Sequence, residues 1–315
     1  MDADTFRKLP QDELARWVRA NGPQVCVFPI NGTRRWFMLE HALNGGDDPL
    51  AAYLGAVEQR HIDLYRLFFD HGVHTLLTPA FGPDLLERGD DYLNLSAYGL
   101  ARVATEPMFL DFYREYGVRV RFYGDYRKYF DPTPHAYLSD LFDDLAQQTL
   151  HHDRHRLFIG LFANDPAETV AALAVQYHAE HGRVPDRRAL VELYYGEYVA
   201  PVDLFVGFDR FAAFDMPLLA LGGEDLYFTV SPSPYLTGSQ LREIFADHLF
   251  TRRADETDYG ELSPGDWALM RSFYQANQDY TIGVGARQPR GSYWFPLPQV
   301  KLPPGFGPTR EDEES

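Results

Sequence analysis

Two adjacent arginines follow a glycine turn in the stretch FPINGTRRWF, residues 28–37. Gly32 lets the backbone approach a ligand closely. The backbone N–H groups that follow it, together with the Thr33 hydroxyl, can hold phosphate oxygens. The guanidinium groups of Arg34 and Arg35 offer paired donors that match phosphate geometry. The stretch therefore favours binding of a multiply charged anion, with diphosphate as the natural candidate, and a turn with two solvated arginines is the alternative.

The turn follows VCVFPI (25–30), the first of six short apolar runs that are rich in β-branched and aromatic residues. The other five are 74–81, 118–124, 156–164, 203–208 and 226–232. Runs that are apolar on both faces are typical of a parallel sheet covered by helices on both sides. The sequence thus predicts an α/β fold, a central, mainly parallel sheet of about six strands flanked by helices.

Helical patterns alternate with these runs. The segment 49–72 has apolar positions at helical spacing and ends at Gly72. The segment 166–182 has Asp165 as a candidate N-cap, Pro166 in its first turn and Gly182 at its end. Because ligands of an open α/β sheet bind outside the carboxyl ends of the strands, the arginine turn is expected at the binding edge.

Composition excludes several functions. A net charge of −17 argues against binding of nucleic acid or of anionic lipid. The charged N-terminus is not expected to be a signal peptide, because it lacks an apolar h-region. No window has the roughly 18 consecutive apolar residues of a membrane span, so no stable membrane anchor is expected. The single cysteine, Cys26, allows no intrachain disulfide and is expected to be a buried small hydrophobe. The expected location is the cytoplasm.

The expected organisation is one catalytic domain over 1–287 and a C-terminal arm over 288–315. The arm is rich in Pro and Gly and ends in REDEES, an acidic end that is expected to be disordered.

Two further patterns in the sequence do not indicate a metal site or a catalytic nucleophile. HHDRHR (151–156) fits a solvated loop better than a zinc site. Ser231 and Ser233 lie in a proline-rich turn and lack the pattern of a nucleophile elbow.

Several long segments resemble the cis-prenyltransferase (undecaprenyl diphosphate synthase) superfamily. They include the arginine turn, VRVRFYGDYRKYF, LFIGLFANDPAETVAAL and PVDLFVGFDRFAAF followed by EDLYFTVSP. Together with RGDDYL and YYGEYV, they are more specifically similar to the tuberculosinol/isotuberculosinol synthase group. These enzymes have the cis-prenyltransferase fold and act on a bicyclic diterpenyl diphosphate. The resemblance runs from about Val25 to about Gly285.

The resemblance implies a role for each matching residue. Gly32, Thr33, Arg34 and Arg35 would bind the diphosphate, and Arg35 would also be catalytic. Arg210 matches one arginine of the family's C-terminal signature and would bind the same group. A second arginine of elongating enzymes has no counterpart near Gly207, which argues against chain elongation.

The remaining implied site residues surround the reacting carbon and the metal. Asn31 stands where the family has a catalytic aspartate, and it carries no charge. Tyr53 and Tyr92 match catalytic tyrosines of the terpene synthase pocket. Asp225 takes the place of the family's metal-binding glutamate, and the cofactor implied is Mg²⁺. The family also implies a homodimer.

The implied reaction is ionisation of an allylic diphosphate, with an aromatic-lined cavity around the hydrocarbon. Capture of the cation by water, or its deprotonation, would make the chain a terpene synthase that releases an alcohol or an olefin. Alternatively, the chain is a prenyl or terpenyl transferase that uses a nucleophile such as a nucleoside. In a third interpretation it is a catalytically silent subunit that binds a prenyl ligand or a partner, because Asn31 replaces the aspartate.

Overall fold

The computed structural model describes residues 1–41, 49–252, 260–288, 290, 293–297, 300–302 and 304, and the acidic end lies outside them. The described chain forms two compact units. The first comprises Met1–Phe208 and Ala212–Arg252, and the second comprises Asp209–Phe211 and Arg253–Ser315. The division into a catalytic domain (1–287) and a C-terminal arm (288–315) remains a prediction from the sequence.

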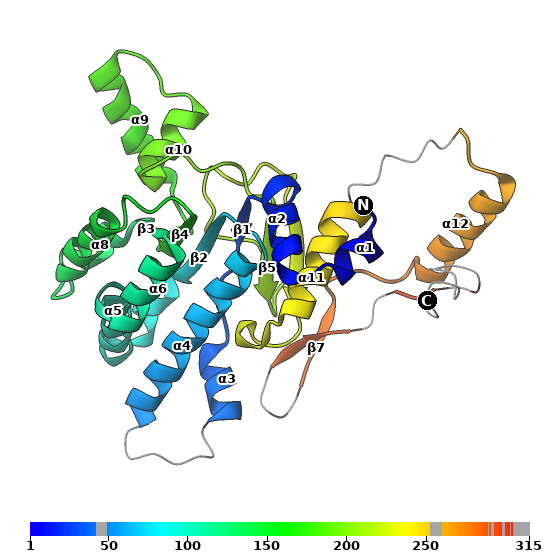
Figure 1. Cartoon of the computed structure of the whole chain (residues 1–315), viewed down its shortest axis with the longest axis horizontal. Coiled ribbons are helices and arrows are strands. Elements are labelled where there is room, and N and C mark those ends of the chain that lie inside the picture. Colours follow the sequence, from blue (N-terminus) through cyan, green and yellow to red (C-terminus); the bar gives the residue numbers. More distant parts are fainter. Residues whose placement is uncertain are drawn as a thin grey trace. The chain divides into compact units, whose positions relative to one another are not determined.

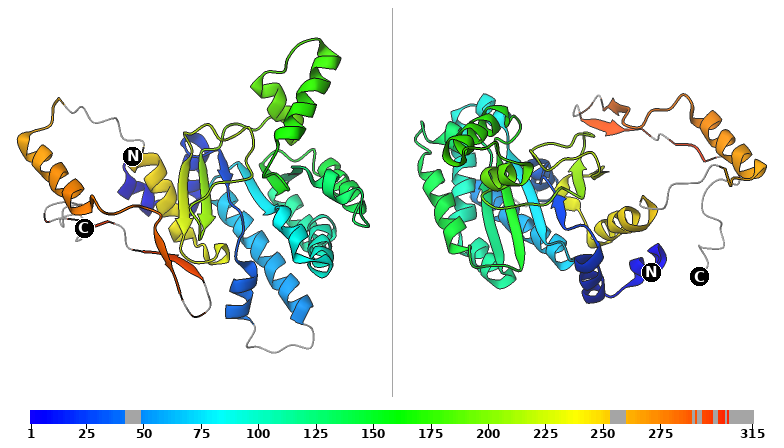
Figure 2. Two further views of the ribbon diagram at one scale, coloured as in Figure 1. Left: turned by 180° about the vertical axis from the view of Figure 1, so that it is seen from behind. Right: turned by 90° about the horizontal axis from the view of Figure 1, so that it is seen from above.

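The first unit contains one sheet of six strands. These are β1 (Val25–Val27), β2 (Thr75–Phe81), β3 (Val118–Tyr123), β4 (His155–Leu161), β5 (Leu204–Phe208) and β6 (Asp225–Thr229). The strand order is β3-β4-β2-β1-β5-β6, and every neighbouring pair is parallel. Figure 2 (left) shows β5 and β6 beside the blue β1. This arrangement confirms the predicted fold class.

Helices connect the strands (Figure 1). They are α1 (Ala3–Lys8), α2 (Gln11–Asn21), α3 (Thr33–Glu40), α4 (Pro49–Asp70), η2 (Pro83–Arg88), α5 (Asp90–Thr105), α6 (Pro107–Tyr116), α7 (Tyr126–Phe130), α8 (Tyr137–Gln148), α9 (Ala167–His181), α10 (Arg187–Tyr195), η3 (Ser233–Tyr235), α11 (Gly238–Ala246) and the π-helical turn η4 (Asp247–Thr251). The two predicted helices are confirmed as α4 and α9. Gly182 ends α9 in the left-handed conformation, and the Asp165 carboxylate accepts a hydrogen bond from Ala167 N at its start.

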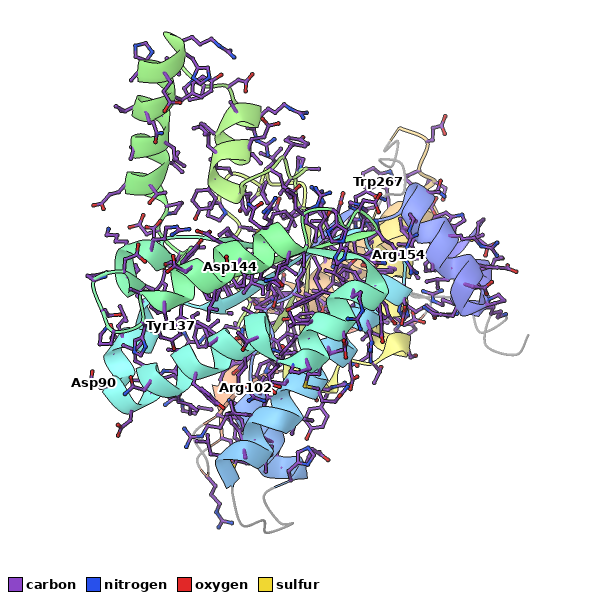
Figure 3. The ribbon with its side chains drawn as sticks, turned by 60° about the vertical axis from the view of Figure 1, so that its left-hand side comes forward. Asp90, Arg102, Tyr137, Asp144, Arg154 and Trp267 are labelled. Atoms are coloured by element: carbon purple, nitrogen blue, oxygen red, sulfur yellow. The ribbon has the colours of Figure 1, made fainter. Side chains whose placement is uncertain are left out.

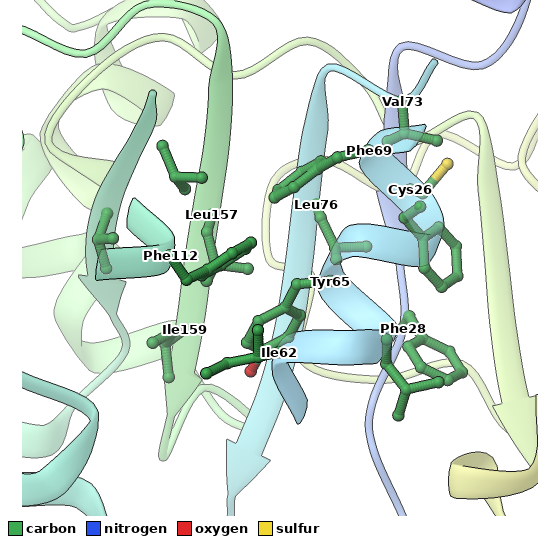
Figure 4. Packing of buried hydrophobic residues seen from close by; sticks show 14 of the residues in the cluster. Cys26, Phe28, Ile62, Tyr65, Phe69, Val73, Leu76, Phe112, Leu157 and Ile159 are labelled. Carbon is green, nitrogen blue, oxygen red and sulfur yellow. The ribbon is translucent and has the colours of Figure 1, made fainter. Parts of the chain in front are cut away.

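The residues of each strand alternate between two apolar clusters. On one face Cys26, Leu76 and Leu157 pack against side chains of α4, α5, α6 and α8. On the other face Val27 and Leu77 pack against α10 and the loops around it. Many of the Phe and Tyr side chains are core residues of this kind, and Figure 4 shows how some of them fill the space between α4 and the sheet. Cys26 is buried, as predicted.

An ion pair joins two helices of the first face. Arg102, labelled in Figure 3, lies on α5 and donates from Nη2 to Glu58 Oε2 of α4 at 2.8 Å. It also pairs with Glu106 Oε1, one turn further along, at 2.5 Å. Glu58 is buried, and this pair neutralises its carboxylate and links α5 to α4. No helix in the described part of the chain is long and apolar enough to span a bilayer.

The second unit contains α12 (Pro264–Asn277) and an antiparallel pair, β7 (Gly285–Arg287) with β8 (Trp294–Pro296). None of its described residues is buried. A cavity of about 460 Å³ runs along α12 and is lined by Trp267, Met270, Arg271, Tyr274, Gln275 and Gln278.

Candidate diphosphate site

The arginine turn joins β1 to α3 at the carboxyl edge of the sheet. The ladder of β1 stops early because Pro29 has no N–H, and Phe28 N makes the last bond, to Leu77 O at 2.8 Å. Gly32 then takes φ 79° at the N-cap of α3. It has no side chain that could accept a hydrogen bond from the first N–H groups of the helix. The first N–H groups of α3 therefore point out of the turn with no side-chain acceptor among the described residues.

The first turn of α3 carries two positive charges and no acidic residue. This composition opposes the helix dipole, which favours anionic side chains at a helix N-terminus by about 0.3–1 kcal/mol each. Arg34 and Arg35 are exposed, and neither forms an ion pair with any residue that the structure describes. The guanidinium of Arg35 lies over the Phe208 ring at 5.4 Å, at the end of β5. Free N–H groups and two unpaired guanidinium groups together make a cradle for an anion.

Gly32 is required by its surroundings as well as by its backbone. A Cβ at this position would lie 2.9 Å from Pro232 Cβ and 3.0 Å from Phe208 Cε1. Gly32→Ala is therefore expected to lower the free energy of unfolding by about 1–3 kcal/mol, since strain of a positive φ adds to the clash. Urea denaturation measures this change. Gly55→Ala in α4 is the matched control, because a Cβ there meets nothing within 4 Å and the helix should gain about 0.5–1 kcal/mol. Equal stability of Gly32→Ala and wild type would contradict the described turn.

Tyr53 is brought to the cradle by α4. Its hydroxyl lies 3.4 Å from Thr33 Oγ1, and its ring meets Phe37 edge-on at 5.2 Å between centroids. Asn31 is exposed beside them, and its backbone rather than its side chain makes the described hydrogen bonds. The structure thus places Asn31, Gly32 and Thr33 with the two arginines and Tyr53 in one small region.

Tyr92 lies at the same edge of the sheet, in the first turn of α5, which follows β2 and η2. Its hydroxyl accepts a hydrogen bond from Arg88 Nη1 at 3.1 Å, and the Arg88 guanidinium lies 5.0 Å from the centre of its ring. Among the described residues it forms no hydrogen bond to the arginine turn. Its catalytic role remains a prediction.

Asp225 lies far from the cradle within the first unit. It is the first residue of β6 and is in register with Leu204, the first residue of β5. A five-residue strand rises by roughly 13 Å, so Asp225 lies at the amino edge of the sheet while the cradle lies at the carboxyl edge. Its carboxylate bonds to His248 Nδ1 at 2.7 Å and Arg252 Nη1 at 3.3 Å. The structure therefore does not place Asp225 beside the arginine turn, and its metal-binding role remains a prediction from the resemblance.

Arg210 belongs to the second unit and is exposed. Its role in diphosphate binding remains a prediction from the resemblance.

The side chains of the cradle offer few of the oxygen ligands that Mg²⁺ takes in proteins. This ion commonly takes one or two carboxylates in addition to phosphate oxygens. Asn31 and Thr33 offer neutral oxygens only, and no group of three His, Cys, Asp or Glu side chains within the described ranges is placed to hold a metal. The donor set of the turn therefore does not fit a resident Mg²⁺, and the cofactor remains a prediction from the resemblance.

Comparisons with known proteins show the family to which the chain belongs. Tuberculosinyl adenosine transferase of Mycobacterium tuberculosis is 42% identical over 282 residues, which make up 89% of this chain and 94% of the relative. The chain belongs to the family of this transferase. (+)-Kolavelool synthase of Herpetosiphon aurantiacus is 25% identical over 284 residues, 89% of this chain and 91% of the relative. No family model matches the chain. The relatives of this family are terpenyl enzymes, which confirms the coarse function that the sequence predicted.

Two solved structures show the family's fold. A probable undecaprenyl diphosphate synthase from Campylobacter jejuni has a TM-score of 0.53 at 14% identity, over 74% of this chain and 97% of its own. Lavandulyl diphosphate synthase from Lavandula x intermedia, solved with dimethylallyl diphosphate, has a TM-score of 0.51 at 14% identity, over 76% and 98%. Both confirm the cis-prenyltransferase fold.

Proposed function

We propose that the chain ionises a terpenyl diphosphate and holds the departing diphosphate on the first turn of α3. The observation that carries this proposal is the pair of unpaired arginines at a helix N-terminus that has no acidic residue. When the carbon–oxygen bond breaks, the electron pair leaves with the diphosphate. The N–H groups of α3 and the guanidinium groups of Arg34 and Arg35 stabilise this developing negative charge.

The hydrocarbon tail is proposed to lie beside the cradle, along the apolar rim of the core. Ile30, Phe81, Tyr92 and Leu93 are half-buried residues that pack against the first apolar cluster. Phe81 ends β2 and the others follow β1 or β2 in the chain, so all four lie at the edge from which the arginine turn projects. Aromatic rings at this rim would favour the allylic cation through their quadrupoles.

Two fates of the cation are proposed. Water adds to the carbon and loses a proton, or the cation loses a proton directly, which gives an alcohol or an olefin. The similarity to (+)-kolavelool synthase supports this fate. Alternatively, a nitrogen of a nucleoside forms the new bond and then loses its proton. The name of the transferase, at the higher identity of 42%, supports this second fate.

The experiment that tests the proposal supplies geranylgeranyl, farnesyl and bicyclic diterpenyl diphosphates. Each is incubated with and without Mg²⁺ and with and without adenosine, and products are identified by mass spectrometry. We expect release of diphosphate from at least one substrate. A terpene alcohol or olefin without adenosine identifies a synthase, and an adenosine adduct identifies a transferase. If none of the substrates releases diphosphate under any condition, the proposal is wrong.

Asn31→Asp tests whether the neutral amide is compatible with catalysis. The wild type is expected to turn over, because its cationic groups need no carboxylate beside them. The variant adds a negative charge next to the bound diphosphate, so its turnover in EDTA should fall about tenfold or more and should recover with excess Mg²⁺. Asn21→Asp, at the exposed end of α2, is the control and should change neither value. Activity in the variant alone would instead identify a silent natural subunit.

A further inference from the structure

The turn after β6 is bonded directly to the arginine turn. Ser233 is 0% exposed and makes three hydrogen bonds to the segment that precedes Gly32. Its N–H donates to Asn31 O at 3.0 Å, its Oγ accepts from Asn31 N at 3.1 Å, and its hydroxyl donates to Pro29 O at 3.1 Å. These bonds join residues that are about two hundred positions apart in the chain.

A hydroxyl group suits position 233 because it can donate one hydrogen bond and accept another. Beyond Phe28 the strand ladder has ended, because Pro29 has no N–H to donate. The Asn31 N–H and the Pro29 carbonyl bond to each other at 3.1 Å, and each can make a second hydrogen bond. The serine hydroxyl donates to the Pro29 carbonyl and accepts from the Asn31 N–H, so it adds a second hydrogen bond to each group.

The rest of the same turn is held from two sides. The Arg60 side chain of α4 donates to Pro234 O at 2.7 Å and to Leu236 O at 3.2 Å. The Tyr235 hydroxyl donates to Glu40 Oε1, at the end of α3, at 2.5 Å. Segment 232–236 is therefore a fixed support that contacts the turn before α3 and the last residue of α3.

We infer that Ser233 is a positioning residue for the diphosphate cradle, an inference that depends on the proposed function. Ser233 sets the backbone of Asn31, and through Gly32 it sets the direction of the first N–H groups of α3. These donors stabilise a leaving group only where they point at its oxygens. A displacement of about 1 Å in a reacting arrangement can cost roughly 10²-fold in rate.

Ser233→Ala removes the hydroxyl and leaves the backbone bond to Asn31 in place. We expect turnover to fall by roughly 10- to 100-fold and the Kd for inorganic pyrophosphate, measured by calorimetry, to rise about tenfold. Hydrogen exchange at the Asn31 amide should become faster, because this N–H loses one of its two acceptors. Circular dichroism should show the fold retained. Ser231→Ala is the matched control, two residues away on the exposed part of the same turn, and should change none of these values.

Tyr235→Phe is a second variant in case Ser233→Ala does not fold, since it removes only the exposed hydroxyl bond to Glu40. It should raise the Kd for pyrophosphate by a few fold. If Ser233→Ala and Tyr235→Phe both bind pyrophosphate and turn over like the wild type, the inference is wrong. If the wild type itself binds no pyrophosphate, the proposed function fails instead, so the two failures are distinguishable.

Discussion

Arg35→Ala is expected to lower the turnover of a terpenyl diphosphate by about 10²- to 10³-fold, the range seen when one donor to a developing oxyanion is removed. Arg35 is held over the Phe208 ring at 5.4 Å and stands in the first turn of α3, next to free N–H groups. Its guanidinium is already positioned before the ligand binds, so it loses little freedom on binding. Steady-state kinetics of diphosphate release measure the change.

Arg35→Lys separates charge from geometry. A lysine keeps the positive charge but loses the planar pair of donors, so its turnover should fall between those of the wild type and Arg35→Ala. Arg16→Ala is the matched control, an exposed arginine of α2 that pairs with Asp12 at 3.5 Å. It should turn over like the wild type. Full activity of Arg35→Ala would count decisively against the cradle.

Acidification from pH 7 to pH 5 is expected to remove about 4 kcal/mol of stability through the half-buried His61 and the buried His155. Burial lowers the pKa of His61 to about 4. Burial, together with the charges of Arg19 and Arg154, lowers the pKa of His155 to about 3. Both values lie below the unfolded value of about 6.5, so the unfolded chain binds more protons below that pH. The stability is fully present above about pH 6.5 and is lost as the pH falls toward the folded values.

The structure supports neutral forms of both rings. His155 Nδ1 donates to Val73 O at 3.2 Å, the ring stacks on Phe69 at 4.3 Å, and Nε2 is buried without a partner among the described residues. Urea denaturation at the two pH values measures the loss. His155→Phe should remove about half of the pH dependence, and exposed His151→Gln should leave it unchanged. A stability that does not differ between pH 7 and pH 5 would contradict the burial of these rings.

The sheet could be predicted because its strands are apolar on both faces, a pattern that survives without tertiary information. The limits of β1 could not, since VCVFPI reads as one run and the ladder stops at the missing N–H of Pro29. The strand order also could not, because the residue types of β1 do not say which two strands flank it. HHDRHR was expected to be solvated, and this was wrong for His155, which faces the core as the first residue of β4.

The cradle could be predicted because its residues are contiguous in the sequence, from Asn31 to Arg35. Tyr53 required the family resemblance, since nothing local marks it among twenty tyrosines. Asp225 matches a motif, yet the direction of β6 places it at the other edge of the sheet. Ser233 was considered only as a nucleophile. Its hydrogen bonds reach across 202 and 204 positions, and no local pattern contains such contacts.

A crystal structure with inorganic pyrophosphate, or with an unreactive thiolo analogue of a terpenyl diphosphate, tests the central claim most directly. The account predicts phosphate oxygens within hydrogen-bond distance of the first N–H groups of α3, with the guanidinium groups of Arg34 and Arg35 on the same oxygens. The hydrocarbon of the analogue should lie along the rim that contains Phe81 and Tyr92. A diphosphate bound elsewhere, with these arginines still in solvent, would contradict the account.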